Sequence, residues 1–241
     1  MKKLMEIKNL IVEKENFKIL NGINLIIYEG VNTFLCGTPS SGKTSLLKSI
    51  SGMQKYKGHI IKNCKIEVLF DDYSFSKDTI LEELDYDTLN DKQKKIVNKF
   101  ISKTTLKKNP FVVEEKTKKL VLLCQVLLRE PQLLFVDNLF SDLDKKTMSK
   151  ILSYLKVKKI TFVHVSTCIE ESLNYPYMVI LNKGSVAVEG KTLQVLEQEK
   201  ILKRLGIGLP FYVDLSIQLR LYGLIDKVYL SKEELEGALW K

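Results

Sequence analysis

The feature that most constrains this 241-residue chain is a short loop, Gly37-Thr-Pro-Ser-Ser-Gly-Lys-Thr44. It fits the pattern G-x-x-x-x-G-K-[ST], with a strand predicted before it and a helix after it. Small residues let successive backbone N–H groups face phosphate oxygens, and the first helical turn adds further N–H groups. A chance loop rich in glycine and serine is the alternative, and the strand–loop–helix frame argues against it. The candidate phosphate-binding residues are Gly37, Thr38, Pro39, Ser40, Ser41, Gly42, Lys43, Thr44 and Ser45.

The apolar pattern around this loop predicts an α/β fold with a mainly parallel sheet. Continuous apolar runs at 133–136 and 160–165 are typical of strands buried in parallel sheets. Runs at 4–12 and 19–28 predict an antiparallel N-terminal β part, and 177–181 with 185–189 predicts a hairpin. After residue 190 we expect a helix to about Arg204, another over 212–222, and a capping box at Ser231-Lys-Glu-Glu234. The expected domains are 1–200, with a helical insert at about 72–128, and a C-terminal helical appendage at 201–241.

Composition excludes some classes of protein and leaves others open. With 38 basic and 29 acidic residues the net charge is +9, which permits an anionic partner without selecting one. The four cysteines form no C-x-x-C pair, and only two histidines are present, so a zinc site is not expected. The longest apolar run, 120–128, is far shorter than the ~20 residues of a membrane span, and Glu6 and Lys8 interrupt any secretory signal. We therefore expect a protein of a reducing compartment with no membrane span.

Charge is laid out in blocks, acidic over 67–91 and basic over 92–119. These blocks are either two solvated, mutually attracting faces of the helical insert or a docking surface for another subunit. The few aromatic residues and the neighbouring acidic block argue against a nucleic-acid partner.

The segment Pro131–Asp144, PQLLFVDNLFSDLD, adds a carboxylate at the end of a buried strand. Asp137 is the candidate Mg²⁺ residue, the alternative being an aspartate that merely opens a loop. This segment resembles the nucleotide-binding subunit of ABC transporters, and Ser141-Asp-Leu-Asp144 matches that family's D-loop. Asn9-Leu10, Gly58 and the segment 181–190 fit the same register, so the resemblance covers about residues 4–198. The segment 205–211 is similar to the C-terminal part of energy-coupling factor transporter ATPases.

The resemblance implies a P-loop NTPase fold that binds ATP and Mg²⁺. It also implies a second ABC ATPase subunit and a transmembrane scaffold subunit, with the chain held at the cytoplasmic face of the membrane. The metal residues would be Thr44, Asp137 and Asp71, the last at the Q-loop position. Lys14 stands where the family has an adenine-stacking aromatic residue, so Phe17 is the candidate substitute.

The sequence departs from the family pattern at the catalytic positions, Asn138 and Thr167. Asn138 replaces the glutamate that polarises the attacking water, and an amide cannot accept a proton. Thr167 replaces the switch histidine, because His164 lies inside a strand and is interpreted as a core residue. Val113-Glu-Glu-Lys-Thr117 replaces the signature Leu-Ser-Gly-Gly-Gln, which places carboxylates near a γ-phosphate unless Lys116, Lys118 or Lys119 offsets them.

The resemblance, with these departures, implies an ATP-binding subunit of an ABC-type importer, similar to the energy-coupling factor kind, with weakened hydrolysis. Its partner ATPase would be a different protein, since a homodimer would carry every defect twice. The alternative is a non-catalytic regulatory or structural subunit that holds a dimer closed. A soluble ABC protein acting on ribosomes or DNA has little support, because the length leaves no room for a second cassette.

Overall fold

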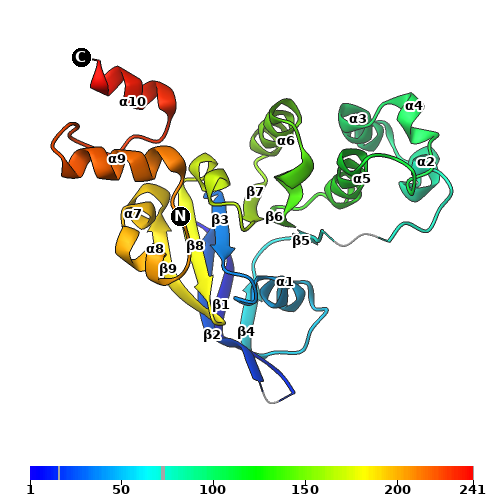
Figure 1. The fold of residues 1–241 in the computed structure, drawn as a ribbon. Helices are drawn as coiled ribbons and strands as arrows, with labels where there is room; N and C mark the ends of the chain where they lie inside the picture. Colours follow the sequence, from blue (N-terminus) through cyan, green and yellow to red (C-terminus); the bar gives the residue numbers. More distant parts are fainter. Residues whose placement is uncertain (16, 72–73, 241) are drawn as a thin grey trace. The chain divides into compact units, whose positions relative to one another are not determined.

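The computed structural model describes residues 1–15, 17–71 and 74–240 (Figure 1). By their internal contacts these residues divide into two compact units. The first comprises 1–5, 28–30 and 61–164, and the second comprises 6–27, 31–60 and 165–241. This division runs through the expected 1–200 domain, and the boundary at residue 200 stays a prediction. Residues 72 and 73, where the helical insert was expected to begin, lie outside the described residues.

The second unit carries most of the N-terminal strands and the phosphate-type loop. Strands β1 (Lys3–Lys14), β2 (Phe17–Tyr28) and β4 (Lys57–Lys62) form a sheet in the order β2-β1-β4. Strand β3 (Thr33–Gly37) pairs in parallel with β8 (Tyr177–Asn182), with Gly37 opposite Leu181. Strand β9 (Ser185–Lys191) runs antiparallel to β8 and completes the predicted hairpin.

The helices of the second unit form where apolar residues share one face. Helix α1 (Lys43–Ser51) buries Leu46, Leu47 and Ile50 and ends at Gly52, as the sequence predicts. The expected helix to Arg204 is instead two short helices, α7 (Thr192–Leu196) and α8 (Glu199–Arg204). Between them the Gln198 carbonyl accepts from the amides of Ile201 and Leu202, which starts a new helix. A 3₁₀ turn, η3 (Ile169–Asn174), lies before β8.

The C-terminal segment forms α9 (Phe211–Leu221) and α10 (Lys232–Leu239). The Ser231 side chain accepts from the Glu234 amide at 3.3 Å, so the cap of α10 is present. The Glu234 carboxylate accepts from the Leu230 amide at 3.1 Å rather than from Ser231, so only half of the expected capping box forms.

The first unit places three strands in the order β5-β6-β7. Strand β5 (Ile66–Leu69) pairs in parallel with β6 (Leu133–Asp137), and β7 (Thr161–Val165) is fully buried. The mainly parallel sheet predicted from the sequence is thus present in both units. The helices and turns of the first unit are α2 (Ile80–Glu83), η1 (Tyr86–Thr88), α3 (Asp91–Phe100), α4 (Lys103–Leu106), α5 (Glu115–Leu128), η2 (Leu139–Asp142) and α6 (Lys145–Val157).

Polar residues begin the short helices of the predicted insert. Thr79 with Glu82 and Asn90 with Gln93 form capping boxes at α2 and α3, and Ser102 caps α4. Each cap satisfies backbone N–H groups that the helix leaves without internal partners. Among the described residues, no helix combines the length and apolar composition needed to cross a bilayer.

Candidate functional site

The phosphate-type loop joins β3 to α1 in the second unit. At Gly37 a Cβ atom would lie 2.2 Å from the Leu181 carbonyl oxygen, and at Gly42 it would lie 2.6 Å from Leu20 Cδ2. Gly42 also has a φ of 103°, which is rare for residues with a side chain. Both glycines are therefore required by the close packing of the loop against β8 and β2.

Lys43 lies within the curve of this loop. Its Nζ donates to the carbonyl oxygens of Gly37 at 2.8 Å and Thr38 at 3.0 Å, and to Ser41 Oγ at 3.3 Å. Cys36 precedes the loop, and burial raises the pKa of its thiol to about 12 against the opposing effect of Lys43. The thiol of Cys36 therefore stays protonated at neutral pH.

A cavity of about 480 Å³ opens beside the loop. The predicted residues Ser40 to Ser45 line it, and Gly37, Thr38 and Pro39 form the preceding part of the loop. Lys18, Ile19 and Lys183 also line it, and sequence reasoning missed all three. Phe17, the candidate base-stacking residue, adjoins Lys18 at the start of β2, and its side chain is 77% exposed.

Hydrogen bonds tie the turn that carries Lys183 to the phosphate-type loop and to β2. The Gly184 amide donates to the Ser41 carbonyl at 3.1 Å, and the Asn21 amide donates to the Gly184 carbonyl at 2.7 Å. Ser185 Oγ donates to the Asn21 carbonyl at 3.1 Å. Three segments distant in sequence therefore place Lys18, Lys43 and Lys183 around one cavity, an arrangement that attracts a multiply charged anion.

The first unit brings together three other predicted positions. Asp137 ends β6, and Asn138 follows it in the left-handed region with a φ of 48°. Asn138 Nδ2 donates to Asp71 Oδ2 at 3.3 Å, so the residues predicted to hold the Q-loop and glutamate positions are neighbours. Asparagine is among the residues that tolerate this backbone conformation, which glutamate disfavours.

A buried lysine joins these positions to the D-loop. The Lys119 side chain is 4% exposed, and its Nζ lies 3.4 Å from Asp71 Oδ1. It donates to the Asn138 carbonyl at 3.1 Å and to Ser141 Oγ at 2.8 Å. Sequence reasoning had considered Lys119 only as a possible counter-charge for Glu114 and Glu115.

The segment at the signature position is the start of α5. Glu114 is the N-cap residue without a side-chain cap bond, and Glu115 begins the helix. Lys118 lies 2.7 Å from Glu115 and offsets its charge, whereas Lys116 pairs with Asp144. The Lys116 ammonium, together with the Thr147 amide and hydroxyl, holds the pKa of Asp144 well below its usual range. Lys118 therefore compensates negative charge at this helix start.

The two histidine-related expectations fall on separate residues. His164 is fully buried in β7, stacked on Phe162 with ring centroids 6.0 Å apart and edge-on to Phe140 at 4.8 Å. Burial lowers the pKa of His164 to about 3, so the ring is neutral at physiological pH. This confirms its interpretation as a core residue. Thr167, at the switch position, is exposed beyond the end of β7.

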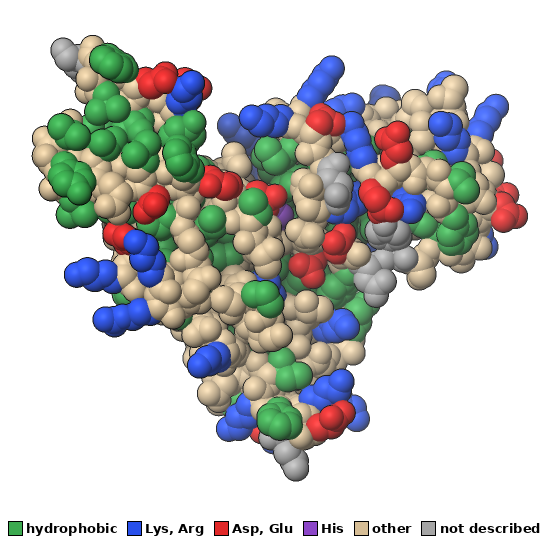
Figure 2. Space-filling model, viewed as in Figure 1, with side chains coloured by type: hydrophobic (Ala, Val, Ile, Leu, Met, Phe, Trp, Pro, Cys, Tyr) green, Lys and Arg blue, Asp and Glu red, His purple; other side chains and the backbone are tan. Residues whose placement is uncertain are grey.

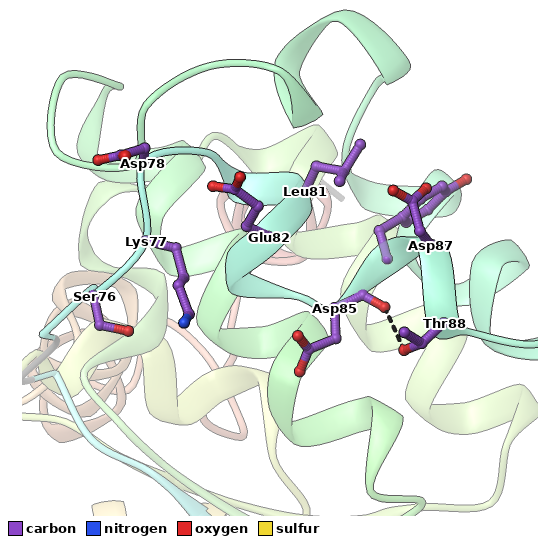
Figure 3. Close-up of a pocket in the computed structure, with 9 residues that line it drawn as sticks. Ser76, Lys77, Asp78, Leu81, Glu82, Asp85, Asp87 and Thr88 are labelled. Carbon is purple, nitrogen blue, oxygen red and sulfur yellow. Dashed lines mark hydrogen bonds between the residues drawn. The ribbon is translucent and has the colours of Figure 1, made fainter.

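A second cavity of about 480 Å³ lies in the acidic part of the predicted insert. Figure 3 shows the residues around it, which come from α2, η1 and the chain before them. Asp85 stands between the two elements, and its carbonyl accepts from Thr88 Oγ1 at 2.8 Å. The residues that line the cavity are Ser76, Lys77, Asp78, Leu81, Glu82, Asp85, Tyr86, Asp87 and Thr88.

Comparison with known proteins agrees with this geometry. A glycine-bounded loop between a buried strand and a helix, in a mixed α/β sheet, defines a P-loop nucleotide-binding fold. The family model for ABC transporters matches residues 20–141. The chain belongs to the ABC transporter family.

Relatives and solved structures extend the match over most of the chain. It is 24% identical to the energy-coupling factor transporter ATP-binding protein EcfA of Pediococcus pentosaceus, over 100% of this chain and 97% of the relative. It is 23% identical to EcfA2 of Clostridium perfringens, over 98% of this chain and 96% of the relative. The fold matches the ATP-binding cassette MJ1267 of an ABC transporter, with a TM-score of 0.73 at 18% identity over 86% of this chain and 100% of that one. It also matches cbiO1 of Clostridium perfringens, with a TM-score of 0.70 at 18% identity over 87% and 97% of the two chains.

Proposed function

We propose that this chain is the ATP-binding subunit of an ABC-type importer of the energy-coupling factor kind. The cavity at the phosphate-type loop carries the proposal, because Lys43 lies inside the loop and Lys18 and Lys183 flank it. The two energy-coupling factor relatives support the subfamily, since each is matched over nearly its full length.

The residues of the loop fit a Mg²⁺-bound nucleoside triphosphate. Backbone N–H groups of the loop and of the first turn of α1 hold the phosphates, and Lys43 adds a positive charge to the terminal ones. Thr44 and Asp137 are the residues proposed to hold Mg²⁺, which supplies positive charge beside the β- and γ-phosphates. Phe17 is proposed to stack on the base.

Hydrolysis by this subunit is proposed to be slow. Asn138 can orient water but cannot take its proton, and losing a general base costs about 10²–10⁴ in rate. Thr167 supplies no imidazole at the switch position. Glu114 and Glu115 would oppose a γ-phosphate held by a partner subunit, although Lys118 pairs with Glu115.

Two partners are proposed, a second ATPase subunit and a transmembrane scaffold. The scaffold would dock on the 71–112 region, where the acidic cavity suits a basic segment. The second ATPase would contact the D-loop, Ser141–Asp144, and the C-terminal helices. Figure 2 shows apolar side chains gathered over α9 and α10. The exposed members include Phe211, Leu221, Tyr222, Leu224 and Trp240. Through these partners the chain would sit at the cytoplasmic face of the membrane.

A second candidate function is a non-catalytic subunit that binds ATP and holds a dimer closed. The replaced residues at 138 and 167 favour it, because both affect hydrolysis while the phosphate loop is complete. The two functions differ in whether the assembled complex needs turnover at the site of this subunit.

Isothermal titration calorimetry of the isolated chain tests the property that both candidate functions share, the binding of Mg²⁺-ATP. We expect Mg²⁺-ATP to bind wild type and Lys43→Ala to abolish or greatly weaken binding. Lys48→Ala is the matched control, since Lys48 lies exposed on the same helix outside the cavity. No heat from the wild-type chain at low salt would contradict the proposal.

A further inference from the structure

Lys119 is a buried cation that contacts three positions of mechanistic interest, Asp71, Asn138 and Ser141. A lysine with 4% of its side chain exposed requires a compensating anion, because desolvation of an ammonium is costly. Asp71 supplies a carboxylate at 3.4 Å. The same Nζ bonds the backbone of Asn138 and the hydroxyl of Ser141. One side chain thus orders three segments, the chain after β5, the end of β6 and the D-loop.

Asp71 and Asn138 form a matched pair beside this ammonium. The amide of Asn138 donates to the Asp71 oxygen that does not face Lys119 most closely, Oδ2 at 3.3 Å. A carboxylate at both positions would set two negative groups against each other at that distance. An amide at both positions would remove the anion that faces Lys119. The cluster therefore favours one carboxylate and one amide.

We propose that Lys119 is a buried structural anchor that holds residue 138 and Ser141 together by binding the carboxylate at position 71. The assignment of position 138 to the hydrolytic site rests on the proposed function. In this chain the carboxylate stands at 71 and the amide at 138, so the anion that Lys119 binds is at position 71 and not at position 138, where the proposed function needs a general base.

An isosteric exchange of the two side chains isolates this effect. Asp71→Asn and Asn138→Asp each change one carboxylate while leaving shape unchanged, and the double variant restores one of each. We expect each single variant to lower the Tm of the full chain by roughly 4 °C or more. The Tm of the double variant should fall by clearly less than the sum of the two single-variant losses. The reason is that the double variant regains both a carboxylate near Lys119 and a donor–acceptor pair. Additive losses in the double variant would overturn the proposal.

Removing the lysine gives an independent measurement. Lys119→Met should lower the Tm, and adding Asp71→Asn to it should restore part of the loss, because the uncompensated carboxylate is removed. The matched control is Lys92→Met, which breaks the exposed pair with Glu130 at 2.6 Å and should change the Tm by about 1–2 °C at most. A Lys119→Met variant as stable as wild type would count against the proposal.

ATP binding by the same variants separates the two hypotheses. The Tm cycle requires no nucleotide, so it tests the role of Lys119 even if the chain binds none. If the Tm losses of the single variants are non-additive but wild type does not bind Mg²⁺-ATP, the proposed function is rejected and the inference about Lys119 is retained. If wild type binds Mg²⁺-ATP but the Tm losses are additive, the proposed function is retained and the inference about Lys119 is rejected.

Discussion

At the scale of single residues, Lys18 and Lys183 extend the positive charge of the loop cavity. Both side chains are exposed, so their attraction to phosphates is screened by salt. We expect Lys183→Ala to weaken Mg²⁺-ATP binding about 3-fold at low salt and less at high salt. Titrations at two salt concentrations measure this, with Lys48→Ala as the control. A loss that is equal at both salt concentrations would contradict an electrostatic role.

A second residue-scale prediction concerns position 138. Asn138→Glu introduces a carboxylate that could act as a base at position 138, but the structure sets it against Asp71 and in an unfavourable backbone conformation. We therefore expect Asn138→Glu alone to raise single-turnover ATP hydrolysis by the assembled complex modestly. Asn138→Glu with Asp71→Gln should raise it further, because the repulsion is removed. Fast wild-type turnover that neither variant changes would show that Asn138 is not at the catalytic position.

The sequence predicted residues that belong to a contiguous motif and missed those brought in from elsewhere. The loop residues 37–45 could be assigned because the pattern itself reflects their chemistry. Lys18 and Lys183 reach the cavity through hydrogen bonds around Asn21, Gly184 and Ser41, which no local pattern reveals. Lys119 was noticed only as one of several lysines after Glu115. Its burial depends on packing of α5, and the helix periodicity alone marks it as an ordinary charged residue.

At the scale of elements, strand β7 carries a buried histidine that should control acid stability. The folded state keeps His164 neutral until its pKa of about 3, whereas the unfolded chain binds the proton near pH 6.5. The stabilising preference for the neutral ring is thus present above pH ~6.5 and is lost as pH falls below it. Between pH ~7.5 and ~5 wild type should lose about 2 kcal/mol of unfolding free energy from this residue.

Urea unfolding at several pH values tests this prediction with two variants. His164→Leu should be less pH-dependent than wild type over that range, whatever its absolute stability. His59→Gln should keep the wild-type dependence, because His59 is exposed on β4. Identical pH slopes for wild type and His164→Leu would refute the assignment.

Elements were predictable where burial leaves a clear pattern. Strands β3, β6 and β7 are buried along almost their whole length and appear as continuous apolar runs. Strand β4 was not predicted, since five of its six residues are exposed and its sequence, KGHIIK, alternates poorly. Strand β5 has only four residues, too few for periodicity to identify. The break at Gln198 depends on backbone hydrogen bonds that leave no compositional signal.

At the scale of the whole molecule, the prediction is pairing with an unlike ATPase subunit. The family resemblance implies that each ATP site combines the phosphate loop of one subunit with the signature segment of the other. If Asn138 and 113–117 hold the glutamate and signature positions as proposed, this chain departs from the pattern in both, and two copies would have no complete site. A partner with its own glutamate would supply a base at one site, although facing Glu114 and Glu115.

Purification of the chain from its native operon, followed by light scattering, checks this pairing. We expect a heterodimer with a different ATPase and slow hydrolysis that depends mainly on the partner's glutamate. Leu221→Ser with Leu224→Ser should weaken the heterodimer, because both side chains are exposed at the end of α9, 73% and 61% respectively. Ile61→Ser, on β4, is the matched control, since it also replaces an exposed apolar side chain. A stable homodimer that hydrolyses ATP would contradict the prediction, because it would show that the replaced residues at 138 and 113–117 do not disable the sites they form.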